Sequence, residues 1–189
     1  MYARKLFHAL GLALIFLTSS ALYAADSKEE QRAEVRKATQ SVLSKLYKAQ
    51  PSAKKAIAAA SGYAVFSNFG MKILFAGGGS GAGIATDRAS GKETFMKMVE
   101  VQAGLGVGVK KFGLVFVFEN PQVLRQFIDS GWVAGAQTSV AASDGNKGMS
   151  MQGAISVSPG IWLFQVTEKG LAAEATIKGT KYYKDEDLN

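Results

Sequence analysis

Glycine recurs at alternate positions in two stretches, and this spacing restricts the possible fold more than any other feature of the sequence. The first stretch runs from Gly77 to Gly83 and the second from Gly104 to Gly108. Side chains alternate between the two faces of a β-strand, so each stretch predicts a strand with one nearly bare face. Glycine weakens a strand unless something approaches it closely. We therefore expect close packing, by the fold itself or by a partner, at Gly77, Gly79, Gly81, Gly83, Gly104, Gly106 and Gly108.

The glycines do not indicate a nucleotide-binding loop. Gly77, Gly79 and Ala82 fit the dinucleotide spacing, but that motif requires a helix directly after it. Residues 84–87 instead lead into a turn at residues 88–91. The Gly-Lys-Ser or Gly-Lys-Thr ending of a phosphate-binding loop is also missing from this stretch. The glycines therefore predict strands rather than a phosphate site.

The first 24 residues have the composition of a secretory signal peptide. Arg4 and Lys5 precede an apolar run from Leu6 to Leu17, and Ala24 supplies a small residue at the expected cleavage site. We expect residues 1–24 to be removed and residues 25–189 to form a single domain. That domain is expected in the periplasm or outside the cell.

The sequence offers few of the side chains on which enzymes rely. It has no cysteine, and its one histidine, His8, lies in the expected signal peptide. Ser-His-Asp and Cys-His catalysis are therefore excluded from the expected mature domain, as are zinc sites built on nitrogen or sulfur. Carboxylates and lysine remain available, but no spacing points to a site. We expect no enzymatic activity, no cofactor and no metal.

A basic amphipathic helix is predicted from Ser27 to about Ala49. Its apolar residues recur at steps of three and four, and the stripe fits either packing onto the fold or contact with a membrane: Val35, Ala38, Val42, Leu43, Leu46 and Tyr47. The opposite side is expected to carry Lys28, Arg32 and Arg36, with the other lysines towards the flanks. Pro51 fits the first turn of a second helix over Ser52–Ala60.

Basic residues are concentrated in these two helices. Between Lys28 and Lys55 there are eight basic and three acidic residues, a net charge of +5, whereas the following residues are nearly balanced. Such a patch attracts anionic partners over a long range. The candidate contact residues are Lys28, Arg32, Arg36, Lys37, Lys45, Lys48, Lys54 and Lys55.

Strands dominate after Gly62, and the run Phe112–Phe118, which is apolar throughout, is expected to be buried on both faces. The expected segments, bounded by turn residues, are Tyr63–Ser67, Ile73–Ala85, Glu93–Val101, Ala103–Lys110, Leu114–Phe118, Val133–Ala142, Met149–Val157, Ile161–Thr167 and Leu171–Lys178. Asn120 and Pro121 begin one further helix, which ends at Ser130. Helices followed by strands predict an α+β fold, with a largely antiparallel sheet or barrel-like sandwich and one inserted helix.

Several sequence blocks, taken in order, resemble the SYLF lipid-binding family. They are Ala59–Phe66, Gly77–Gly83, Ala103–Gly108, Leu114–Phe118, Ser139–Ala142, and Lys169–Ala175 with Tyr182 and Tyr183. The resemblance spans about residues 35–183 and implies a binding module without enzymatic activity. It also implies lipid contact at the eight basic residues, because eukaryotic relatives bind phosphoinositide-containing membranes, partly through a basic amphipathic helix. Some of those relatives bind actin.

Two binding functions remain open from the sequence, and a hydrolase or transferase that uses only carboxylates and lysine is the third and weakest hypothesis. The first is peripheral attachment to anionic phospholipid membranes through the basic helix, where each basic side chain contributes about 1 kcal/mol near a charged surface. The second is a structural or adaptor role in the cell envelope, in which the glycine-rich sheet face accepts a strand or helix of a protein partner. Neither function involves nucleic acid.

Overall fold

The computed structural model describes residues 27–73, 76–103, 108–134, 151–168, 170–171 and 179–189. Side chains are described in these ranges except at residues 69–73, 76–77, 102–103 and 108–110. Three helices lie within the described ranges: an N-terminal helix at residues 27–49, α2 at Ala53–Ala59 and α3 at Pro121–Asp129.

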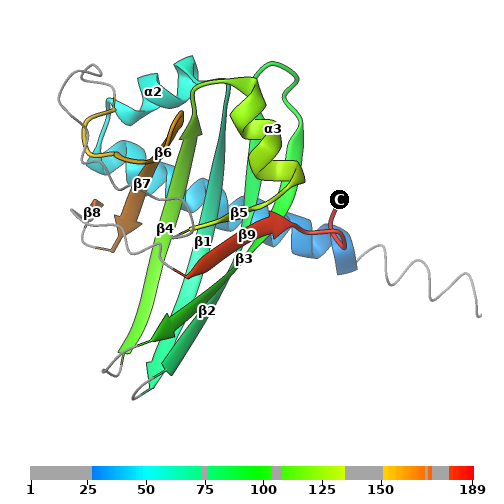
Figure 1. Cartoon of the computed structure of the whole chain (residues 1–189), viewed down its shortest axis with the longest axis vertical. Coiled ribbons are helices and arrows are strands. Elements are labelled where there is room, and N and C mark those ends of the chain that lie inside the picture. The colour runs from blue at the N-terminus through cyan, green and yellow to red at the C-terminus, as the bar shows by residue number, and fades with distance from the viewer. Residues whose placement is uncertain (1–26, 74–75, 104–107, 135–150, 169, 172–178) are drawn as a thin grey trace, which may run out of the picture.

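The described strands form one antiparallel sheet (Figure 1). They are β1 (Gly62–Ile73), β2 (Ala76–Asp87), β3 (Glu93–Ala103), β4 (Gly108–Phe118), β5 (Trp132–Val133), β6 (Ile155–Ser158), β7 (Ile161–Thr167), β8 (Gly170–Leu171) and β9 (Thr180–Lys184). Their order is β5-β9-β3-β2-β1-β4-β7-β6, and β8 pairs with β7. The predicted α+β class with a largely antiparallel sheet is confirmed.

Strand β4 is buried on both faces over its second half. Leu114, Phe116 and Phe118 belong to a core cluster with α3, whereas Val115 and Val117 belong to a cluster with the N-terminal helix and α2. All five side chains are at most 1% exposed. Because strand side chains alternate between faces, an uninterrupted apolar run requires a covering layer on each side. The prediction that this segment is buried on both faces is confirmed.

The α3 side of the sheet is held by aromatic side chains. Phe127 of α3 lies 5.3 Å from Phe116 and 5.8 Å from Tyr182, measured between ring centroids. The start of α3 is fixed by its predicted cap, since Asn120 Oδ1 accepts a hydrogen bond from the Val123 amide at 2.9 Å. The cap sets the position from which Phe127 reaches the core.

The other side of the sheet is covered by the N-terminal helix and α2. Val42, Leu43 and Leu46 are at most 8% exposed and pack with the inner residues of β1, β4 and β7. At Gly113 the helix comes so close that an added Cβ would overlap Val42. The packing interpretation of the apolar stripe is therefore confirmed: Val42, Leu43 and Leu46 are buried against the sheet, and Val35, Ala38 and Tyr47 are half-buried.

Two glycines of β2 have no room for a side chain. A Cβ at Gly81 would lie 2.6 Å from the Ser67 carbonyl oxygen and 2.8 Å from Met98 Cγ, and a Cβ at Gly83 would overlap Phe66. On the opposite face of β2, a Cβ at Gly78 would meet only the Glu100 carbonyl oxygen, at 3.4 Å. The fold itself thus fills the space above Gly81 and Gly83.

The remaining expected close-packing glycines are only partly described. Gly77 and Gly79 lie in β2 and Gly108 begins β4, whereas Gly104 and Gly106 lie outside the described residues.

Strands β1 and β3, which flank β2, make a buried polar contact across the glycine residues of β2. Asn68 is paired with Gly81, and Glu100 with Gly79. Asn68 Nδ2 donates to Glu100 Oε2 at 3.1 Å, and the two residues are 4% and 2% exposed. Small residues in β2 therefore leave space for side chains to meet across it.

The same buried region affects Tyr182. Burial raises the pKa of the Tyr182 hydroxyl well above its usual range, and the nearby charge of Glu100 raises it further.

Three strand predictions need correction. The segments Ala103–Lys110 and Leu114–Phe118 were expected as separate strands. Instead, β4 runs without a break from Gly108 to Phe118. Gly113 lies within this strand, where its missing side chain lets the helix approach. Residues 151–153 form a turn rather than the start of a strand, and Gly153 has a φ of +85°. Ile73 and Ala85 belong to different strands, β1 and β2.

Other expected strands are covered only in part by the structure. The expected strand from Val133 to Ala142 falls mostly outside the described residues, as does the one from Leu171 to Lys178. Strand β9, which pairs with β3, was not predicted.

Strand β2 allows a matched test of the glycine packing. We expect Gly81→Ala to lower the free energy of unfolding by about 1–3 kcal/mol, because the methyl group must displace backbone and Met98. Gly78→Ala in the same strand should change it by less than about 0.5 kcal/mol, since its surroundings are open. Urea denaturation of both variants measures the difference, and equal effects would contradict this account.

A second prediction concerns acid stability. Lys97 Nζ lies 2.8 Å from Asp185 Oδ1 and 2.9 Å from Asp187 Oδ2. Hydrogen bonding to Lys97 lowers the pKa of Asp187 below its usual 3.8. A carboxylate whose pKa is lowered by folding stabilises the folded state above its unfolded pKa, and this contribution is lost as the pH falls below that value.

We therefore expect Lys97→Met to lower the stability by about 1 kcal/mol near neutral pH, a value limited by the partial exposure of Lys97. The gap in melting temperature between wild type and variant should close as the pH falls below about 4. Thermal unfolding monitored by circular dichroism across this range provides the measurement. A gap that stays constant with pH would show that the ion pairs do not contribute.

Candidate functional site

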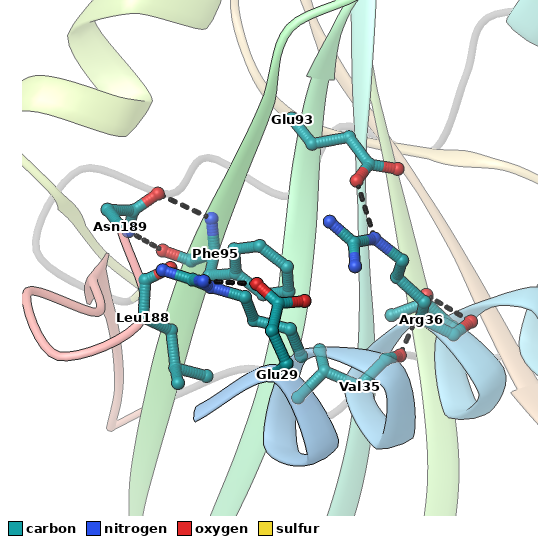
Figure 2. A network of polar contacts seen from close by, with 9 residues as sticks. Glu29, Val35, Arg36, Glu93, Phe95, Leu188 and Asn189 are labelled. Carbon is teal, nitrogen blue, oxygen red and sulfur yellow. Dashed lines mark hydrogen bonds and ion pairs between the residues drawn. The ribbon is translucent and has the colours of Figure 1, made fainter. Parts of the chain in front are cut away.

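The eight basic residues of the N-terminal helix and α2 do not form one uniform surface. Arg32 is half-buried, and the other seven are exposed. The expectation that Arg32 and Arg36 lie opposite the apolar stripe is wrong. Arg32 bonds to the segment after β9, and Arg36 bonds to Glu93 of β3, as Figure 2 shows. The structure thus separates two arginines bonded within the fold from the lysines.

Arg36 anchors the helix to the start of β3. Its Nε donates to Glu93 Oε2 at 2.9 Å, and its guanidinium lies 5.1 Å from the centroid of the Phe95 ring. A cation over an aromatic face is attracted to the ring's negative face, so both contacts hold the arginine against the sheet (Figure 2).

Arg32 joins the helix to the segment after β9. Its Nε donates to the Leu188 carbonyl at 2.9 Å, and its guanidinium also pairs with Glu29. Leu188 is 5% exposed and belongs to a small cluster against which Val35 packs. Asn189 accepts from the Phe95 amide at 3.0 Å and donates to the Phe95 carbonyl at 2.8 Å. Residues 185–189 therefore hold the first turns of the helix.

On its other flank the N-terminal helix borders a groove of about 360 Å³ between the helix and the sheet. Lys45 lines it from the helix and Lys111 from β4, and Glu168 lies at the end of β7. Hydroxyl groups and apolar side chains make up much of the remaining wall: Ser41, Ser67, Ser80, Thr167, Val42, Phe112 and Val166. The groove is therefore lined by cationic, hydroxyl and apolar side chains.

Sequence reasoning found Lys45 but missed Lys111 and the hydroxyl groups. Lys111 directly precedes the apolar run of β4, which was a signal of a cation at the edge of the core. Its position near Lys45 depends on the packing of helix against sheet, which the local sequence does not reveal.

Neither a cluster of metal ligands nor a membrane-spanning helix is found among the described residues. Within the described ranges, no three or more histidine, cysteine, aspartate or glutamate side chains gather as a metal site requires. None of the helices in the same ranges is long and apolar enough to cross a bilayer.

Part of the chain matches a known protein family. Residues 99–189, which run from within β3 through the groove residue Lys111 to Asn189, match the family model described as "Ysc84: Las17-binding protein actin regulator". These residues belong to the Ysc84 (SYLF) family. The family match begins after the N-terminal helix, so the basic residues of that helix and of α2 lie outside it. The SYLF resemblance predicted from the sequence is confirmed.

A curated protein supports the same relationship over a longer stretch. The chain is similar to beta cell expansion factor A of Aeromonas veronii, with 32% identity over 160 residues. The alignment covers 85% of this chain and 59% of the length of that relative. The chain therefore spans a little over half of the length of the Aeromonas protein.

The two kinds of basic residue can be separated experimentally. We expect Arg36→Met to lower the free energy of unfolding by about 1 kcal/mol, because it removes the Glu93 ion pair and the contact with Phe95. Lys37→Met, at the next position on the exposed side, should leave stability within about 0.5 kcal/mol of wild type. Chemical denaturation of both variants is the measurement, and equal stabilities would show that Arg36 is not an anchor.

Proposed function

We propose that this SYLF protein attaches peripherally to anionic phospholipid membranes through the exposed lysines of its N-terminal helix and α2. The observation that carries the proposal is the division of the helix: its apolar stripe packs on the sheet, whereas its lysines stay exposed. The contact residues are Lys28, Lys37, Lys45, Lys48, Lys54 and Lys55. Arg32 and Arg36 add to the positive field while bonded within the fold.

The attachment is electrostatic rather than insertive. An interfacial helix inserts by burying its apolar face among lipids. Here Val42, Leu43 and Leu46 already pack against the protein, so their transfer to lipid would first require the helix to leave the sheet. Each lysine near an anionic surface contributes about 1 kcal/mol, and salt screens this attraction within a Debye length of about 8–10 Å.

The proposal places the protein in the periplasm or outside the cell. The signal-peptide composition of residues 1–24 supports this location, with cleavage after Ala24. The membrane surface encountered there would be the anionic phospholipid of the cell envelope.

A protein partner is the second candidate, because the description of the matching family model names Las17 binding. Such a partner would not dock above Gly81 and Gly83, since Met98 and Phe66 occupy that space. An adaptor would have to use another surface of the domain.

Co-sedimentation with vesicles tests the membrane proposal. The chain from Ala25 onward should bind phosphatidylglycerol-containing vesicles at low salt, bind much more weakly at high salt, and ignore phosphatidylcholine vesicles. The double variant Lys37→Gln/Lys48→Gln should bind about 30-fold more weakly, which corresponds to about 1 kcal/mol for each lysine.

The matched control is Lys92→Gln/Arg125→Gln, which removes the same charge from exposed positions that do not belong to the N-terminal helix or α2. If the two double variants lost affinity equally, net charge rather than this surface would drive binding. Absence of binding to any vesicle would overturn the proposal and favour the protein partner.

A further inference from the structure

The N-terminal helix is docked in two different ways along its length. Its second half is fixed by buried apolar side chains, because Val42, Leu43 and Leu46 are at most 8% exposed. In its first half, from residue 27 to 38, no residue is buried, and Val35 is half-buried. A helix of about twelve residues is marginally stable by itself, and segments with few buried apolar contacts open locally at a low cost in free energy. The first half therefore depends on other contacts.

Contacts with two other segments hold this first half in place. Arg36 ties it to β3, and residues 185–189, which we call the strap, lie against its first turns (Figure 2). Arg32 Nε donates to the Leu188 carbonyl of the strap at 2.9 Å. Leu188 itself is 5% exposed and belongs to the cluster on which Val35 packs. The strap therefore gives the first half of the helix both a polar and an apolar contact.

The strap is held in turn by polar contacts with β3. The Asn189 side chain accepts from the Phe95 amide at 3.0 Å and donates to the Phe95 carbonyl at 2.8 Å, as a paired strand residue would. Lys97 Nζ lies 2.8 Å from Asp185 Oδ1 and 2.9 Å from Asp187 Oδ2. Because Lys97 and Asp187 are partly exposed, water and salt weaken their attraction. The strap is thus closed by individual hydrogen bonds and ion pairs rather than by a large apolar surface.

Each of these two segments supports the other. The strap bonds to the first half of the helix, and the first half packs on Leu188 of the strap, so opening of one removes contacts of the other. We infer that the strap is a conformational latch. While it is closed, residues 27–38 are docked on the sheet. When it opens, they leave the sheet and uncover Ile84 and Phe95, which are 4% and 5% exposed in the closed state, whereas the second half of the helix stays docked.

The inference goes beyond the proposed function and does not depend on it. Membrane attachment uses lysines that are exposed in the closed state, whereas the latch is a change within the protein itself. Lys28 and Lys37 lie on the segment that the latch releases, and Lys45 and Lys48 lie on the part of the helix that stays docked. Opening of the latch therefore rearranges the lysine surface without changing its charge.

Hydrogen exchange of backbone amides, followed by mass spectrometry, tests the latch. Asn189→Ala removes the bonds between the strap and β3, and Arg32→Met removes the bond to the strap from the side of the helix. We expect each variant to speed the exchange of the amides of residues 31–38 about tenfold, because each loses hydrogen bonds that close the latch. Exchange of residues 40–48 should change by less than about twofold, since buried side chains hold that half.

Two further variants make the test specific. Glu186→Ala is the matched control within the strap, because Glu186 is exposed and its carboxylate pairs with Lys184 of β9 at 3.6 Å. It should leave the exchange of residues 31–38 within about twofold of wild type. The double variant Asn189→Ala/Arg32→Met should exchange no more than about twofold faster than the single variants, since both substitutions open the same latch. Far-ultraviolet circular dichroism confirms that each variant is folded.

The outcomes decide the inference whether or not the protein binds vesicles. Faster exchange confined to residues 31–38 in both single variants, with no further gain in the double variant, supports the latch. Faster exchange along the whole helix would show that it opens as one unit, and the inference would be wrong. Unchanged exchange in Asn189→Ala, or equal effects of Asn189→Ala and Glu186→Ala, would also overturn it. So would a double variant that exchanges about a hundredfold faster than wild type, because the two contacts would then act independently.

Discussion

Burial of β4 between two layers is the constraint on which the rest of this structure depends. Its apolar residues alternate between the α3 side and the side of the N-terminal helix, so neither helix can be removed without exposing part of the core. Gly113 lets the N-terminal helix approach β4 directly, and Asn120 fixes α3 at the end of the same strand. One strand therefore sets the position of both covering layers.

Features set by local sequence could be predicted. The cap at Asn120, the apolar stripe of the N-terminal helix and the double burial of residues 114–118 each depend on neighbouring residues and appear as expected. Gly113 was misread as part of a break between strands, because glycine marks both turns and close approaches. The structure shows that Gly113 serves a close approach, because Val42 of the helix occupies the space where its side chain would lie.

The candidate sites depend on contacts that the local sequence does not record. Periodicity placed Arg32 and Arg36 opposite the apolar stripe, but a long side chain at the border of a helix can bend towards a partner that the pattern does not contain. Those partners, Glu93 and Leu188, are distant in sequence. The groove likewise combines the helix with β1, β2, β4 and β7, so its composition follows from topology. A basic stretch read from sequence therefore mixes residues that hold the fold with residues that face a partner.

The hydrogen bond from Arg32 to Leu188 has a consequence for the order of folding. The two residues are 156 positions apart, so closing this contact requires a very large loop. During synthesis, the helix emerges long before Leu188 and the strands that cover its apolar stripe. For most of the time that the ribosome takes to synthesise the chain, the hydrophobic side of the helix is therefore uncovered and prone to aggregation.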